Sequence, residues 1–152
     1  MTYNSADYLQ NLEIGHIFQD HVMIELIKKG ICLQCFASRQ NQFKIGESIQ
    51  GIEVKLDSRC TDTHRLSIEI GEKKATSNIW IPSGILRDDN SLFYVQGNYD
   101  IYFFFSKRTL KEYFKNTKPK IHYYNGTLRK FYIDFDVAKD LCEFWEETIN
   151  KQ

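Results

Sequence analysis

Two short segments of this chain alternate apolar with polar or charged residues, and this alternation constrains the fold more than any other feature. In residues 52–57, Ile-Glu-Val-Lys-Leu-Asp, the apolar side chains would lie on one face of a β-strand and the charged ones on the other. In residues 66–71, Leu-Ser-Ile-Glu-Ile-Gly, the alternation repeats. Each segment therefore predicts a strand with one buried face. If the two strands pair, Glu69 faces the same side as Glu53 and Asp57.

The polar row of the first segment combines carboxylates with an ammonium group. Carboxylate oxygens are the ligands that Mg²⁺ prefers, and Lys55 lies between two acids, where it can orient a water molecule or stabilise negative charge. Carboxylates clustered on one face are unfavourable unless a cation neutralises them. The same alternation is also typical of an ordinary antiparallel strand with a solvated charged face. The pattern alone leaves a metal site and a plain surface strand both open.

Composition places the chain among ordinary globular proteins. Its 152 residues are 42% hydrophobic, which is enough apolar surface for one core, so we expect a single domain over residues 1–152. No apolar run is long enough to span a bilayer, and the N-terminus lacks the basic and apolar regions of a signal peptide. We therefore expect a cytoplasmic protein that has no membrane partner.

The cysteines allow two interpretations. Cys32 and Cys35 have the spacing of zinc ligands, and Cys60 and His64 are available to complete a set of four. However, residues 31–36 also have the composition of a buried strand, and no second paired motif follows. We favour free structural thiols, which a reducing compartment would keep reduced.

The formal net charge is zero, but basic residues concentrate in one block. Residues 106–130 hold eight Lys or Arg and a single acid, which suits a surface that follows a phosphate backbone. An ordinary solvated helix and loop would have the same charges. The candidate nucleic-acid contacts in this block are Lys107, Arg108, Lys111, Lys118 and Lys120.

Periodicity along the rest of the chain predicts an α+β protein with one central mixed sheet flanked by helices. We expect Gly15 to split the first helical region, residues 37–44 to form a loop, and residues 58–65 to form a hairpin loop. Helices are expected at 5–29, 106–115 and 137–149, and strands at 31–36, 52–57, 66–71, 78–81, 92–96, 101–105, 121–124 and 128–133.

The order of these features resembles the PD-(D/E)XK nuclease superfamily. The Glu53-Val54-Lys55 triplet stands on a predicted strand, after an amphipathic helix and a glycine. A short loop and Leu-Ser-Ile-Glu at 66–69 follow, and then Pro-Ser-Gly-Ile at 82–85 precedes an aromatic strand. This ordered combination, over about residues 12–115, is similar to phage and restriction-type members of the superfamily.

The resemblance implies an endonuclease that hydrolyses DNA phosphodiester bonds with Mg²⁺ or Mn²⁺. It makes Glu53 a metal ligand and Glu47 the other acidic ligand, since an acid precedes the triplet in the family. Lys55 would position or activate the attacking water. Asp57 and Glu69 would be additional ligands.

Two departures from the family pattern leave alternatives open. No Pro-Asp pair precedes the triplet, and the gap from Glu47 to Glu53 is short. In a second register Asp57 and Glu69 would be the two acids, with Gly71 where lysine is expected. Lys73 would then have to reach back. We prefer the first register because it keeps the lysine on the same face as its neighbouring acids.

The first helix departs from the pattern as well. Many members of the family place a glutamate there, and Gln19 occupies the matching position, where its carbonyl oxygen is a candidate metal ligand without charge. Asp20 and Glu25 are the substitutes. All three residues also fit an exposed helix surface.

These departures sustain an alternative function. The chain would then be a non-catalytic nucleic-acid-binding or protein-interaction module on a nuclease-like scaffold. A small zinc-stabilised regulatory domain is the third interpretation. DNA is the predicted partner. Both a monomer and a homodimer stay open as the assembly.

Overall fold

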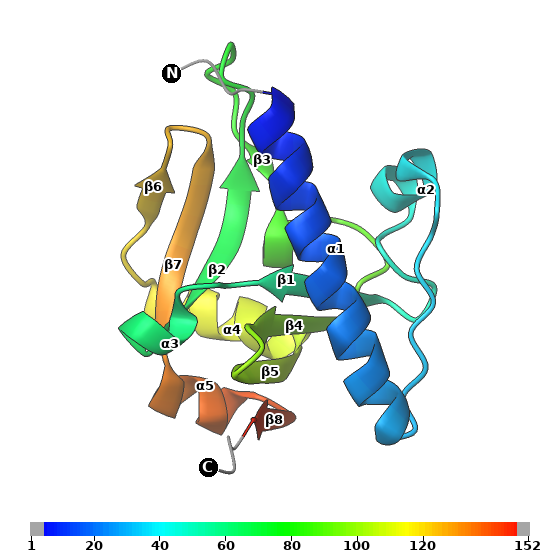
Figure 1. Cartoon of the computed structure of the whole chain (residues 1–152). Helices are drawn as coiled ribbons and strands as arrows, with labels where there is room; N and C mark the ends of the chain where they lie inside the picture. The colour runs from blue at the N-terminus through cyan, green and yellow to red at the C-terminus, as the bar shows by residue number, and fades with distance from the viewer. Residues whose placement is uncertain (1–4, 149–152) are drawn as a thin grey trace.

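The computed structural model describes residues 5–148, which form five α-helices, one 3₁₀ helix and eight strands (Figure 1). The strands make two four-stranded sheets rather than one. The predicted α+β class is therefore confirmed, and the single central sheet is wrong.

The first sheet has the strand order β1-β4-β5-β8. Strand β1 (Ile52–Leu56) runs parallel to β4 (Phe93–Gly97), and β4 runs antiparallel to β5 (Ile101–Ser106). Strand β8 (Phe144–Glu147) completes the sheet beyond β5. The strand with the Glu-Val-Lys triplet thus forms as predicted, at an edge of this sheet.

The second sheet is antiparallel throughout and has the order β3-β2-β7-β6. Its longest strands are β2 (Arg65–Glu72) and β7 (Leu128–Asp134), flanked by β3 (Ile81–Pro82) and β6 (His122–Tyr124). The predicted pairing of the two alternating segments is wrong, because β1 and β2 belong to different sheets. The alternation places Ile52 and Val54 in the core, but β1 also buries Glu53 on its other face, and no alternation indicates which strand lies alongside.

Two hydrophobic clusters hold the molecule together. Helix α1 (Ser5–Lys28) places Phe18, Val22 and Leu26, spaced four residues apart, against the apolar face of β1 and β4. The other cluster joins the inner face of β2 and β7 to β5. Helices α4 (Lys107–Thr117) and α5 (Phe135–Leu141) cover that second cluster.

Several expectations from local pattern differ from the structure. Helix α1 runs through Gly15 without interruption. The predicted strand at 31–36 does not form. An isolated bridge joins Cys35 to Ser48, and the other residues of the segment pair with no strand. The predicted loops contain helix α2 (Arg39–Lys44), which Ser38 caps, and helix α3 (Cys60–Thr63).

The predicted C-terminal helix at 137–149 is also wrong over its second half. Helix α5 ends at Leu141, and Phe144–Glu147 then pair antiparallel with β5. Phe144 stacks on Phe104 with 4.8 Å between ring centroids, so pairing with an open strand edge prevails over local helical spacing. Ile149, assigned to that helix's buried face, lies outside the described residues.

The 3₁₀ helix η1 (Gly84–Leu86) follows β3 and packs on β2. Among the described residues, no helix is long and apolar enough to cross a membrane.

Candidate functional site

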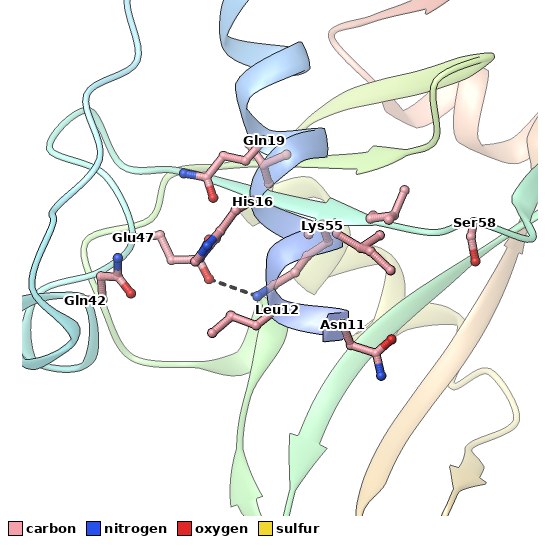
Figure 2. Close-up of a pocket in the computed structure, with 12 residues that line it drawn as sticks. Asn11, Leu12, His16, Gln19, Gln42, Glu47, Lys55 and Ser58 are labelled. Carbon is pink, nitrogen blue, oxygen red and sulfur yellow. Dashed lines mark hydrogen bonds and ion pairs between the residues drawn. The ribbon is translucent and has the colours of Figure 1, made fainter. Parts of the chain in front are cut away.

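The side chain of Lys55 forms ion pairs with two carboxylates. Its Nζ lies 2.9 Å from Glu53 Oε1 and 3.0 Å from Glu47 Oε1. Figure 2 shows the contact between Glu47 and Lys55 beside helix α1. The first predicted register is the arrangement that the structure brings together.

Backbone contacts place Glu47 beside the strand. The amide of Phe36 donates to the Glu47 carbonyl oxygen at 3.1 Å, and the amide of Ile49 donates to the Gln34 carbonyl oxygen at 2.9 Å. The Ser48 hydroxyl then accepts from the amide of Ile52 and donates to its carbonyl oxygen. This short ladder fixes the acid eight residues ahead of the lysine, within reach of its ammonium group.

Glu53 is buried, with 2% of its surface exposed, and its Oε2 has no hydrogen-bond partner. Burial raises the pKa of this carboxyl, although the neighbouring Lys55 ammonium partly offsets the effect. A buried carboxylate oxygen without a partner is unfavourable, and it can accept a bond from a cation or a proton.

Lys55 keeps one third of its side chain exposed. Desolvation acts to lower the pKa of its ammonium group, but Glu53 and Glu47 outweigh it, and the pKa lies well above the ordinary value. Lys55 therefore stays protonated at neutral pH and acts as a hydrogen-bond donor and a fixed positive charge.

Three cavities meet at Lys55. The helix cavity, about 530 Å³, lies between α1 and β1 (Figure 2). The sheet groove, also about 530 Å³, runs from β1 along β2 and β7. The acid pocket, about 360 Å³, is lined by Glu47, Glu53 and Glu69. Such convergence of concave surfaces on a charged cluster is typical of a binding site.

Helix α1 contributes to two of these cavities. Gln19 and His16 lie on the side of the helix that faces Glu47 and Lys55, and Figure 2 draws all four around one space. The Gln19 amide nitrogen donates to Cys35 Sγ at 2.6 Å, so its carbonyl oxygen is not used in that bond. His16, one turn earlier, also lines the acid pocket and was not among the predicted site residues. Its i, i+3 spacing to Gln19 is the signal that could have found it.

Glu69 reaches the acid pocket from the second sheet. Its Oε1 accepts a hydrogen bond from the hydroxyl of Ser83, which is buried. Gly84 has φ +52°, and a Cβ there would lie 2.2 Å from the Glu69 carbonyl oxygen, so only glycine fits. The Pro-Ser-Gly-Ile segment singled out in the sequence therefore orients Glu69.

Asp57 lies on the same face of β1 but takes a different role. Its Oδ2 accepts from the amide of Ser67 at 2.7 Å and from the Gln96 side chain at 3.4 Å. This carboxylate fastens the start of β2 to the first sheet and lines the sheet groove rather than the acid pocket.

The predicted basic surface needs one correction. Lys107 is buried, and its Nζ donates to Asp89 Oδ1, the Arg87 carbonyl oxygen and Ser91 Oγ at 2.6–2.9 Å. Lys107 therefore forms an ion pair with Asp89 inside the protein. At the start of α4, one side of the helix faces the protein interior. The other predicted contacts are exposed and lie outside the linings of the three cavities: Arg108, Lys111, Lys118 and Lys120.

Carboxylate oxygens are the ligands that a hard divalent cation prefers. Glu53 supplies a buried oxygen without a partner, and Glu47 and Glu69 border the same pocket. Within residues 5–148 no three His, Cys, Asp or Glu side chains converge as a complete ligand set, and the Lys55 ammonium bridges Glu47 and Glu53.

The zinc interpretation is wrong for the predicted set. Cys60 is buried in the cluster between the sheets, whereas Cys35 packs against the cluster beneath α1. All four cysteines are free thiols; Cys60 is buried, Cys35 and Cys142 are partly buried, and Cys32 is exposed, so Cys32 does not have the buried structural role that we favoured.

No family model, curated protein or solved structure matches the chain.

Proposed function

We propose that the protein is a Mg²⁺- or Mn²⁺-dependent endonuclease of the PD-(D/E)XK type that hydrolyses DNA phosphodiester bonds. The supporting observation is the joining of Glu47, Glu53 and Lys55 by contacts of 2.9–3.0 Å at the meeting point of three cavities. The family resemblance assigned these same three residues to catalysis.

Glu53 and Glu47 would hold the cation, with Glu69 and the Gln19 carbonyl oxygen as further ligands. The bound ion would supply Lewis-acid stabilisation of the phosphate and an activated water molecule. Lys55, protonated because its pKa is raised, donates a hydrogen bond to a phosphate oxygen or to the attacking water.

One observation favours the non-catalytic alternative. Lys55 already pairs with both carboxylates and balances one of their two negative charges without a metal ion, although one buried oxygen of Glu53 has no partner. A module that binds DNA or another protein would need nothing more from this cluster.

Cleavage of DNA tests the proposal directly. Labelled linear DNA and supercoiled plasmid are incubated with the protein in Mg²⁺, Mn²⁺, Ca²⁺ or EDTA, and cleavage is expected with Mg²⁺ or Mn²⁺. The Lys55→Ala and Glu53→Gln variants should lose about 10²–10³-fold in rate, as when one charge-stabilising group is removed from an active site.

The matched control is the exposed Lys28–Glu25 pair of α1, whose contact of 2.7 Å resembles that of the site. Lys28→Ala should cleave like the parent protein. Full activity of a folded Lys55→Ala protein would refute the assignment. Specific binding without cleavage in any metal would favour the alternative.

A further inference from the structure

The outer face of the second sheet carries aromatic and cationic side chains in alternation. The Arg65 guanidinium lies 4.7 Å from the ring centroid of Tyr132. The Lys130 ammonium lies 5.4 Å from that ring and 4.4 Å from the ring of Tyr124. His122 meets Tyr132 edge-on, with 4.9 Å between centroids. These five residues form a cation–aromatic ladder.

Strand register places the ladder on the face away from the core. Lys130 of β7 lies opposite His122 of β6 and Glu69 of β2. Phe131, the next residue of β7, is fully buried on the other face. Tyr124 is 51% exposed. In Figure 1 helix α1 lies over β1, to the side of β6 and β7.

The ladder leads to the proposed catalytic residues. Arg65, Lys130, Tyr124 and Tyr132 line the sheet groove, and Lys55 and Glu69 line both that groove and the acid pocket. Cations outnumber carboxylates along the groove, and one of the carboxylates, Asp57, is engaged by the Ser67 amide. The charged side chains of the groove are Lys55, Arg59, Arg65, Lys130, Asp57 and Glu69.

We propose that the sheet groove binds single-stranded DNA. Aromatic rings stack on unpaired bases, whose faces are covered inside a duplex, and cations beside them contact the phosphates. Tyr124 and Tyr132 would stack on bases, while Arg59, Arg65 and Lys130 follow the backbone towards Lys55. The inference rests on the proposed function, which makes Lys55 the end point of the bound DNA strand. It places the expected DNA surface on the second sheet rather than on helix α4.

Binding without cleavage tests the groove. The anisotropy of a labelled oligothymidylate is measured in EDTA, and a duplex of the same length is the competitor. Tyr124→Ala and Tyr132→Ala should each weaken binding of the single strand about tenfold, the usual effect of losing one stacking ring. Arg65→Ala should lower the slope of log Kd against log salt by about 0.7, as expected when one phosphate contact is lost.

Tyr123 provides a matched control. It neighbours Tyr124 on β6, it is 63% exposed, and it packs with Trp80 rather than with the ladder. Tyr123→Ala should bind like the parent protein, and Tyr124→Phe should keep most of the affinity because the ring remains. Circular dichroism and thermal unfolding establish that each variant is folded.

The outcomes separate the two proposals. The groove proposal would be overturned if the duplex bound as tightly as the single strand or more tightly, or if an RNA strand of the same sequence bound more tightly than the DNA strand. It would also be overturned if Tyr123→Ala lost as much affinity as Tyr124→Ala and Tyr132→Ala. Ladder-dependent binding in a protein that never cleaves DNA would support the groove and refute the nuclease. DNA cleavage at the parent rate in the ladder variants would support the nuclease and refute the groove.

Discussion

Lys107 and Lys55 each contact a buried carboxylate, and they differ in how completely their surroundings are satisfied. Lys107 has 4% of its side chain exposed and donates to three oxygen atoms, and Asp89 Oδ1 also receives the Ser91 amide. Lys55 is one third exposed, borders three cavities and pairs with Glu53, whose second oxygen has no partner. A complete network holds a loop in place, whereas an incomplete one at a cavity leaves capacity for a ligand.

The largest expected effect separates the two lysines by stability. Lys107→Ala leaves the buried Asp89 carboxylate with the Ser91 donors and the Arg87 ion pair at 3.5 Å, and should cost about 3–5 kcal/mol of unfolding free energy. Lys55→Ala should cost much less at neutral pH, because its site is partly solvated and Glu53, with its raised pKa, can take up a proton. Urea unfolding of both variants measures the difference. Equal losses of unfolding free energy in the two variants would contradict the distinction between Lys107 and Lys55.

The second prediction concerns pH and the Lys107 network. Burial acts to raise the pKa of Asp89, but hydrogen bonds from Ser91 and Lys107 outweigh it, so the pKa is lowered. Its stabilisation is therefore fully present above the unfolded-state value of about 3.9 and is lost as the pH falls through the folded-state pKa. The stability difference between the parent and Asp89→Asn should shrink from pH 6 to pH 3. The exposed Asp140→Asn serves as the control, and a difference that is constant with pH would contradict the assignment.

The smallest effect concerns the orientation of Glu69. Ser83→Ala removes the hydroxyl that donates to Glu69 Oε1 and should lower metal-dependent cleavage several-fold at a stability cost of about 1 kcal/mol. Ser77→Ala, in the loop before β3, is the control and should leave cleavage unchanged. A loss of stability without any change in cleavage would exclude Glu69 from the site and make Ser83 purely structural.

Sequence reasoning predicted the local elements of the site but not their neighbours. Alternation predicted β1 and its charged face, and the family resemblance selected Glu47, which lies against Lys55. The parallel pairing of β1 with β4 joins segments about forty residues apart, and no local pattern encodes that choice. Glu69 reached the acid pocket without the predicted strand pairing, because Ser83 and Gly84 direct it there.

The basic block shows the limit of composition. Five of the eight cations between residues 106 and 130 were candidate nucleic-acid contacts, with an ordinary solvated helix and loop as the alternative. The structure instead buries Lys107, exposes others on α4, and places Lys130 among aromatic rings on β7. Charge counts do not distinguish these environments, because burial depends on which face of each element meets the core.

The parallel partnership of β1 and β4 also determines when the acidic cluster can assemble during synthesis. Within residues 5–148, β1 has β4 as its sheet neighbour, which becomes available once residues 93–97 have left the ribosome, and Glu69 is oriented by residues 83–84. A nascent chain that ends before β4 would therefore carry Glu53 and Lys55 on an unpaired strand. The growing polypeptide therefore acquires the full surroundings of the Glu53–Lys55 pair late in synthesis.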